Sequence, residues 1–151
     1  MLFRTHFIFG ILLGLLFMNY FDEKIIFFIF VLIGSILPDI DTPKSKIGKK
    51  VFLSRIFKFF LGHRGFIHSI YPVIFVFVVF YYFNMVYAGW GFLIGYLGHL
   101  VLDGLTKQGV NFLQPLSSFK IRGFIKVGGF LEKIVFGLII VLILVRLGLI
   151  L

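Results

Sequence analysis

Four short stretches of the chain carry all its histidines and three of its aspartates, side chains that bind divalent metals and transfer protons. They are the segment around His6, the two carboxylates of LPDID, the two histidines of GHRGFIHS, and the His–Asp pair of GHLVLD. His99 and Asp103 in the last stretch are four residues apart, so on a helix they share one face. That spacing is suited to binding one metal ion or to a His–Asp hydrogen bond.

The LPDID and GHRGFIHS stretches are less regular. Asp39 and Asp41 follow a proline, and two nearby carboxylates repel each other unless a cation or a proton lies between them. His63 and His68 are five residues apart, so on a regular helix they would point about 140° apart. Gly65 between them favours a loop that carries His63, followed by a helix whose first turn carries His68. Taken alone, each group is also compatible with a solvated helix end.

The rest of the chain is strongly apolar. Hydrophobic residues make up 60% and charged residues 14% of the 151 residues, and the mean hydropathy is +1.10. Soluble domains have about 45–50% apolar and about 25% charged residues. The composition therefore predicts an integral membrane protein, an all-α polytopic helix bundle that forms a single domain over residues 1–151. Because the chain has no cysteine, disulfides and thiolate zinc sites are excluded.

Five apolar stretches are the candidates for membrane-spanning helices. A bilayer core about 30 Å thick needs about 20 helical residues, with a range of about 17–25. Two glycine pairs, Gly10/Gly14 and Gly91/Gly95, have the spacing that lets helices pack closely. The predicted spans are residues 3–21, 25–38, 67–83, 86–103 and 133–151.

The basic residues are distributed unevenly around these five spans. The N-terminus and the segments 39–66 and 104–132 share one side, and thirteen of the 15 Lys and Arg residues fall there. Lys24 and Arg146 alone fall on the other side. The positive-inside rule therefore predicts an inner-membrane protein with a cytoplasmic N-terminus and an extracytoplasmic C-terminus. Because the net charge of +9 lies mostly on one side, we expect the basic residues to contact membrane lipids and not nucleic acid.

The same topology brings all four histidines and three of the aspartates to the cytoplasmic helix ends. Ionisable residues at membrane level are costly and are candidates for function. Seven nitrogen and oxygen donors exceed the three or four of one tetrahedral zinc site, and two ions about 3.5–4 Å apart would use about seven. Imidazole with carboxylate favours zinc or manganese over calcium. We therefore expect two divalent metal ions, in preference to a metal-free cluster of solvated side chains.

Four motifs together carry a resemblance to a known family. RTHFIFG (4–10), GSILPDIDTPKSKIGKK (34–50), GHRGFIHS (62–69) and GHLVLDGLTKQGVNFLQP (98–115) resemble the YdjM-like family of membrane-bound metal-dependent hydrolases. That family is grouped with all-helical zinc enzymes such as phospholipase C, so the resemblance implies phosphoester hydrolysis. Thr42 departs from the pattern, since many members have histidine after the DID motif. The metal ligands that the resemblance implies are His6, Asp39, Asp41, His63, His68, His99 and Asp103.

The expected activity is that of a di-metal phosphoesterase at the cytoplasmic membrane surface. Two bound metals would lower the pKa of coordinated water toward about 7 and bind phosphoryl oxygens. Arg64 has the fork geometry that grips a phosphate, although it is equally suited to anchoring lipid headgroups. The predicted catalytic residues are Arg64 and Asp41, with Ser45, Lys46, Arg64 and Lys107 binding substrate. Ser69 and Thr106 are expected to hydrogen-bond the ligands or to cap helix ends.

The short second span bears on the substrate. About 14 apolar residues precede Asp39, and at about 1.5 Å per residue they extend only about 21 Å. This length places Asp39 and Asp41 below the headgroup plane, which favours a phospholipid or another membrane-associated phosphoester. Local thinning of the bilayer is the competing explanation. The alternative function is a metal-ion transporter or sensor, whose ligands would lie near the bilayer midplane.

Overall fold

In the computed structural model, the backbone is described for residues 1–41 and 66–149. This part of the chain is all-helical, as predicted, and contains no named strand. Two isolated β-bridges, Thr106 with Ile125 and Val110 with Ile121, close the long loop before the last helix. The α-helices are α1 (Phe3–Phe17), α2 (Lys24–Ile36), α4 (Ile70–Tyr82), α5 (Val86–Gly104) and α6 (Phe130–Gly148), with 3-10 turns η1 (Met18–Tyr20) and η2 (Leu37–Asp41).

Each predicted span has one of these helices in its place, with differences at the ends. The first and second spans finish as the 3-10 turns η1 and η2, not as regular helix. The last helix begins three residues earlier than predicted, directly after Gly129. Gly128 before it has a φ of 74°, the left-handed conformation that glycine adopts without strain. As a result Glu132 lies inside the first turn of α6, where the prediction had placed it in a loop.

Length and composition identify one described segment, Phe3–Tyr20, as able to cross a membrane. The apolar helix Ile70–Tyr82 is shorter than such a span. The other helices are shorter, or carry more polar residues: α2 has 13 residues, and α6 contains Glu132, Lys133 and Arg146. The all-helical architecture is therefore confirmed, and the five-span topology stays a prediction.

Helices α2 and α5 pack with their backbones in close approach. A methyl group at Gly95 of α5 would collide with the carbonyl oxygen of Val31 on α2, and one at Gly34 of α2 would collide with that of Phe92 on α5. Only glycine permits this separation. The Gly91/Gly95 pair therefore has the packing role that the sequence predicted. Because the two helices are held together, the end of α2 and the end of α5 lie close to each other.

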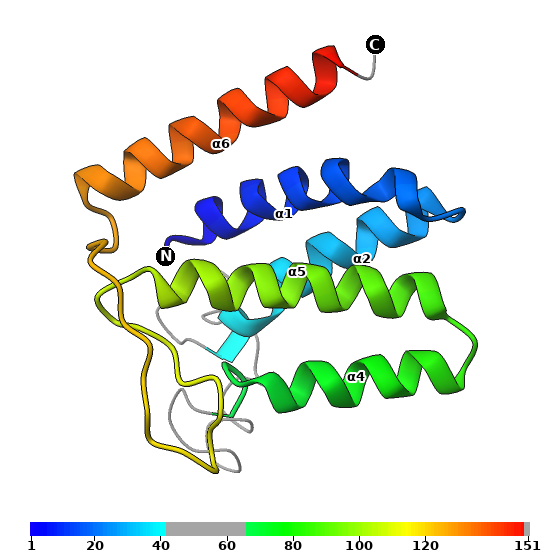
Figure 1. Cartoon of the computed structure of the whole chain (residues 1–151), viewed down its shortest axis with the longest axis horizontal. Coiled ribbons are helices and arrows are strands. Elements are labelled where there is room, and N and C mark those ends of the chain that lie inside the picture. Colours follow the sequence, from blue (N-terminus) through cyan, green and yellow to red (C-terminus); the bar gives the residue numbers. More distant parts are fainter. Residues whose placement is uncertain (42–65, 150–151) are drawn as a thin grey trace.

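The remaining helices surround this pair (Figure 1). Helix α1 lies against α2, with Gly10 facing Ser35 and Gly14 facing Phe28, so the second glycine pair is also a packing surface. Helix α4 packs on α5, where Val73 joins a buried cluster around Tyr96. Helix α6 lies on the outside, mainly against α1.

One end of the bundle collects the start of α1, the end of α5, the turn η2 and the starts of α4 and α6 (Figure 1). These are the ends that carry His6, Asp39, His68 and His99. The loop of residues 105–129 also lies at this end and returns the chain from α5 to α6. The fold thus gathers motifs that are far apart in the sequence.

Candidate metal centre

Two histidines form the buried centre of the site. His6 on the second turn of α1 and His99 near the end of α5 are each 1% exposed. Their rings stack with centroids 3.8 Å apart and an interplanar angle of 14°. Two imidazoles at this separation repel each other if both are protonated. The stack therefore favours neutral rings, the form in which histidine binds metals.

The orientation of His99 is fixed by the end of α2. Its Nδ1 lies 2.8 Å from the carbonyl oxygen of Ser35, and since a carbonyl only accepts, Nδ1 carries the proton and donates it. The neutral ring then has a bare lone pair on Nε2. A backbone carbonyl that holds the second nitrogen in this way is typical of metal-binding histidines. Ser35 is itself buried, and its hydroxyl donates to the Leu32 carbonyl at 2.8 Å.

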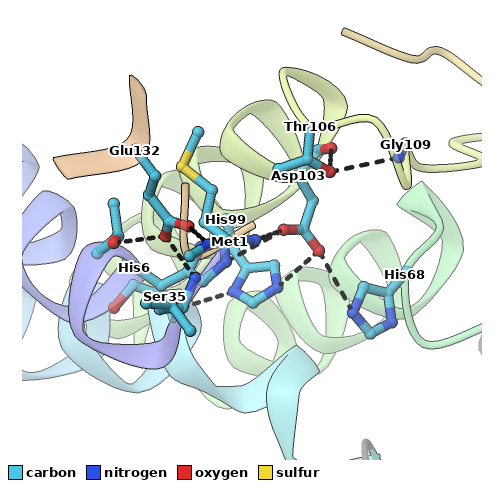
Figure 2. Close-up of polar contacts among 12 residues, drawn as sticks. Met1, His6, Ser35, His68, His99, Asp103, Thr106, Gly109 and Glu132 are labelled. Atoms are coloured by element: carbon cyan, nitrogen blue, oxygen red, sulfur yellow. Dashed lines mark hydrogen bonds and ion pairs between the residues drawn. The ribbon is translucent and has the colours of Figure 1, made fainter. Parts of the chain in front are cut away.

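Asp103 is the carboxylate around which the histidines gather (Figure 2). Its Oδ1 lies 3.2 Å from Nε2 of His6. Its Oδ2 lies 3.6 Å from Nε2 of His99 and 3.8 Å from Nε2 of His68. The amino group of Met1 also contacts Oδ1. These side chains come from α1, α5 and the segment before α4, and the ammonium group offsets part of the negative charge of Asp103.

Asp39 adds a second carboxylate from η2. Its oxygen and one nitrogen each of His6 and His99 lie within 4.8 Å of one another, as do one ligand atom each of His68, His99 and Asp103. Burial is the main cause that raises the pKa of Asp39 above its usual range. A nearby cation would favour the ionised form of this carboxyl and lower its pKa again.

These donors fit a divalent metal ion. Nδ1 of His6 and Nε2 of His99 are buried and have no hydrogen-bond partner within the described residues. Buried polar atoms without a partner are rare and need an explanation. Nε2 of His99 faces a carboxylate oxygen of Asp103 at 3.6 Å, an arrangement that a positive charge between them stabilises. A metal cation supplies such a charge, and imidazole with carboxylate is a donor set suited to zinc or manganese.

The structure brings together five of the seven predicted ligands: His6, Asp39, His68, His99 and Asp103. Asp41 ends η2, and its side chain lies outside what the structure describes. His63 also lies outside the described residues, as do the predicted substrate contacts Ser45, Lys46 and Arg64. The roles assigned to those residues stay predictions.

Ser69 and Thr106, the two residues predicted to support the site, hydrogen-bond backbone groups beside it. The Ser69 hydroxyl donates to the Phe66 carbonyl at 2.6 Å, just before α4. The Thr106 hydroxyl donates to the carbonyl of Asp103 at 2.8 Å and accepts from the amide of Gly109 at 3.3 Å. Both hydroxyls thus secure the helix ends that carry His68 and Asp103. The side chain of Lys107 is exposed, and its role in substrate binding stays a prediction.

Two supporting residues were not found from the sequence. Tyr96 is fully buried, and its hydroxyl donates to the carbonyl of Ile67, one residue before His68. Glu132 is 2% exposed and hydrogen-bonds the start of α1. Glu132 follows Gly129 by three residues, the spacing of a helix-capping glutamate, so a local capping role was predictable. Its partner on α1 was not.

The fold and the site define a class: an all-helical protein with a histidine–aspartate cluster at one end of its helices. The profile of the YdjM inner membrane protein family matches residues 1–150 of the chain. The chain therefore belongs to this family of inner membrane proteins, which confirms the resemblance seen in its motifs.

Known relatives match part of the chain. The uncharacterized protein YvsG of Bacillus subtilis (strain 168) is 36% identical over 107 residues, which cover 68% of this chain and 66% of YvsG. The inner membrane protein YdjM of Escherichia coli (strain K12) is 39% identical over 89 residues, which cover 53% of this chain and 44% of YdjM. YdjM of Shigella flexneri gives the same identity and coverage. The matched region thus spans less than half of YdjM, and no solved structure matches the chain.

Proposed function

We propose that this protein is a membrane-bound metal-dependent hydrolase that acts on a phospholipid or another membrane-associated phosphoester. The observation that carries the proposal is the convergence of buried ligand atoms: one atom each of His6, Asp39 and His99 lie within 4.8 Å of one another, as do one atom each of His68, His99 and Asp103. Nδ1 of His99 lies against the Ser35 carbonyl, so its Nε2 is the nitrogen that faces Asp103, and His6 stacks on its ring. Family membership supports an inner-membrane location, and the N-terminal end of the bundle is proposed to face the cytoplasm.

The geometry of His99 bears on the number of metal ions. Its Nδ1 lies against the Ser35 carbonyl, so Nε2 is the nitrogen left to bind an ion. Both groups of ligands include His99, which supports one site in preference to two. We infer that the described residues hold one ion. A second ion, as the sequence predicts, would need Asp41 and His63.

When bound, such an ion lowers the pKa of its water toward about 7 and polarises a phosphoryl oxygen. The protein's own residues supply the geometry: Ser35 orients His99, and Thr106 secures the end of α5 that carries Asp103. Arg64, Ser45, Lys46 and Lys107 are the proposed phosphate contacts, and Asp41 the proposed catalytic carboxylate.

A lipid phosphoester suits the position of the site along the helices. Helix α2 has 13 residues and is therefore about 20 Å long, compared with about 30 Å for the bilayer core. If its start lies at one membrane surface, Asp39 at its other end lies below the headgroup plane. A phosphoester attached to a lipid reaches that depth more readily than a soluble nucleotide does.

Metal content is the first test. We expect wild-type protein, purified in detergent and loaded with zinc or manganese, to retain at least one ion per chain. Asp39→Asn and His99→Ala should lose it, whereas Asp22→Asn, an exposed aspartate at the opposite end of the bundle, should not. Loaded wild type should then hydrolyse defined phospholipids in mixed micelles. Wild-type protein without bound metal would overturn the proposal, and turnover of soluble phosphoesters alone would exclude the lipid substrate.

A metal-ion transporter or sensor is the alternative function. Its ligands would lie near the bilayer midplane, whereas the described donors gather at one end of the helices. Uptake of metal into proteoliposomes, without hydrolysis of any phosphoester, would favour this alternative over the hydrolase.

A further inference from the structure

Glu132 joins two helices at the metal centre. Its Oε1 accepts hydrogen bonds from the amide of Leu2 at 2.6 Å and the hydroxyl of Thr5 at 2.8 Å. Its Oε2 accepts from the amide of Gly128 at 2.6 Å. The side chain is 2% exposed, and Figure 2 shows it beside Met1 and His6. One buried carboxylate therefore holds three donors from two separate segments.

This arrangement has a clear electrostatic cause. The first turn of a helix has unpaired amides and a partial positive charge, which a carboxylate stabilises. Leu2, the residue before α1, has no side chain that can cap the helix, and Gly129 before α6 has none either. Glu132 meets both needs, since one oxygen lies at the start of α1 and the other at the start of α6. Its desolvation is offset by charge-assisted hydrogen bonds.

The contact of Glu132 with the start of α1 matters because this part of α1 carries His6, a proposed metal ligand. Thr5, which donates to Glu132, immediately precedes His6, whose ring must stay stacked on His99. Helix α6 packs mainly against α1, and side chains along much of it, such as Leu138 and Leu142, are exposed. Besides packing and the Arg4 guanidinium over the Phe136 ring, the described contacts between the start of α1 and this end of α6 come from Glu132. The carboxylate thus ties the last helix to the turn that holds a metal ligand.

We propose that Glu132 is a positioning residue of the metal centre: it locks the first turn of α1 to α6 and so keeps His6 in register with His99 and Asp103. Its effect on metal affinity rests on the proposed function, whereas the lock itself does not. Because Glu132 contacts no ligand atom of the site, its substitution should act mainly through the turn that carries His6.

Hydrogen exchange tests the lock without metal. In Glu132→Gln, the amide nitrogen replaces an acceptor and faces a donor from Leu2, Thr5 or Gly128. We expect amide exchange at Leu2 and Gly128, the two amides that donate to Glu132, to become at least about tenfold faster when measured by NMR in detergent micelles. Glu23→Gln, the same change at an exposed position at the other end of the bundle, should leave both rates unchanged. Unchanged rates in Glu132→Gln would overturn the lock.

A double-mutant comparison tests the positioning role. Glu132→Gln should weaken metal binding about 10- to 100-fold, as the loss of other residues that orient ligands does. In a His6→Ala background the same change should have no further effect, because the ligand that it positions is gone. If the losses of metal affinity in the two single variants multiply in the double variant, Glu132 does not act through His6. Unchanged metal binding in Glu132→Gln alone would overturn the positioning role as well. If wild type binds no metal, the proposed function fails, and the exchange rates still decide the lock.

Discussion

The two ends of the helix bundle use the same side chains in opposite ways. At the turn between α1 and α2, Asp22 and Glu23 are exposed, and Asp22 accepts one hydrogen bond from the Tyr87 hydroxyl at 2.9 Å. At the other end, the Asp103 carboxylate has three histidines around it, and Glu132 is buried with three donors. Buried carboxylates cost free energy unless they are paired. The proposed metal site rests on this difference, since this end, and not the other, gathers buried carboxylates with histidines.

The largest expected effect comes from removing the central carboxylate. Asp103→Asn keeps the shape of the side chain and removes its charge, so the histidines lose the anion that they share. We expect metal affinity to fall by more than about 100-fold, beyond the usual cost of losing an outer-sphere partner. Competition with a chelating dye measures this change in metal affinity.

The matched change at the opposite end is Asp22→Asn. It removes the same charge from an exposed residue and should leave metal affinity within about twofold of wild type. Equal losses in the two variants would mean that the affinity reflects overall charge and not the cluster around Asp103.

The next largest effect concerns the backbone contact that brings the site together. A methyl group at Gly95 collides with the Val31 carbonyl, whereas one at Gly137 on α6 meets nothing within 4 Å. Gly95→Ala should therefore cost about 1–3 kcal/mol of unfolding free energy, because α5 must move away from α2. Gly137→Ala should be neutral or stabilising by up to about 1 kcal/mol. Unfolding followed by circular dichroism in mixed micelles compares them.

The Gly95 variant also links packing to the site. Displacing α5 from α2 separates His99 from the Ser35 carbonyl that fixes its tautomer. Metal affinity should fall together with stability in Gly95→Ala and stay unchanged in Gly137→Ala. A stable Gly95→Ala variant with wild-type metal affinity would contradict the close helix contact.

Much of this comparison was predictable from the sequence because it depends on local pattern. Apolar runs separated by polar turns predicted the helices to within a few residues. The glycine spacing predicted close packing at Gly91 and Gly95, though not that α2 would be the partner helix. The ligands His99 and Asp103 were predictable as a pair because helical periodicity puts residues four apart on one face. The positive charge on one side gave the grouping of the other ligands.

What the sequence did not predict depends on contacts between distant segments. The bond of Glu132 to Leu2 joins residues 130 positions apart, and no periodicity connects them. Ser35 accepts through its backbone carbonyl, and the Tyr96 hydroxyl donates to the backbone carbonyl of Ile67. Each residue has such a carbonyl, so the residue types give no signal for these two pairings. The helix ends also differed, since 3-10 turns finish α1 and α2 where apolar composition predicted continued helix.

The smallest expected effect compares two tyrosine hydroxyls. Tyr96 is buried and donates to the Ile67 carbonyl beside His68, whereas Tyr87 is at the opposite end and donates to exposed Asp22. Tyr96→Phe leaves a buried carbonyl without this donor and should cost about 1 kcal/mol of unfolding free energy. Metal affinity should fall a few-fold, because the segment that holds His68 loosens. Tyr87→Phe should change neither quantity measurably, since water replaces the lost hydroxyl. If both variants lose affinity equally, Tyr96 does not support the ligand, and the contrast between the two ends rests on Asp103 and Glu132 alone.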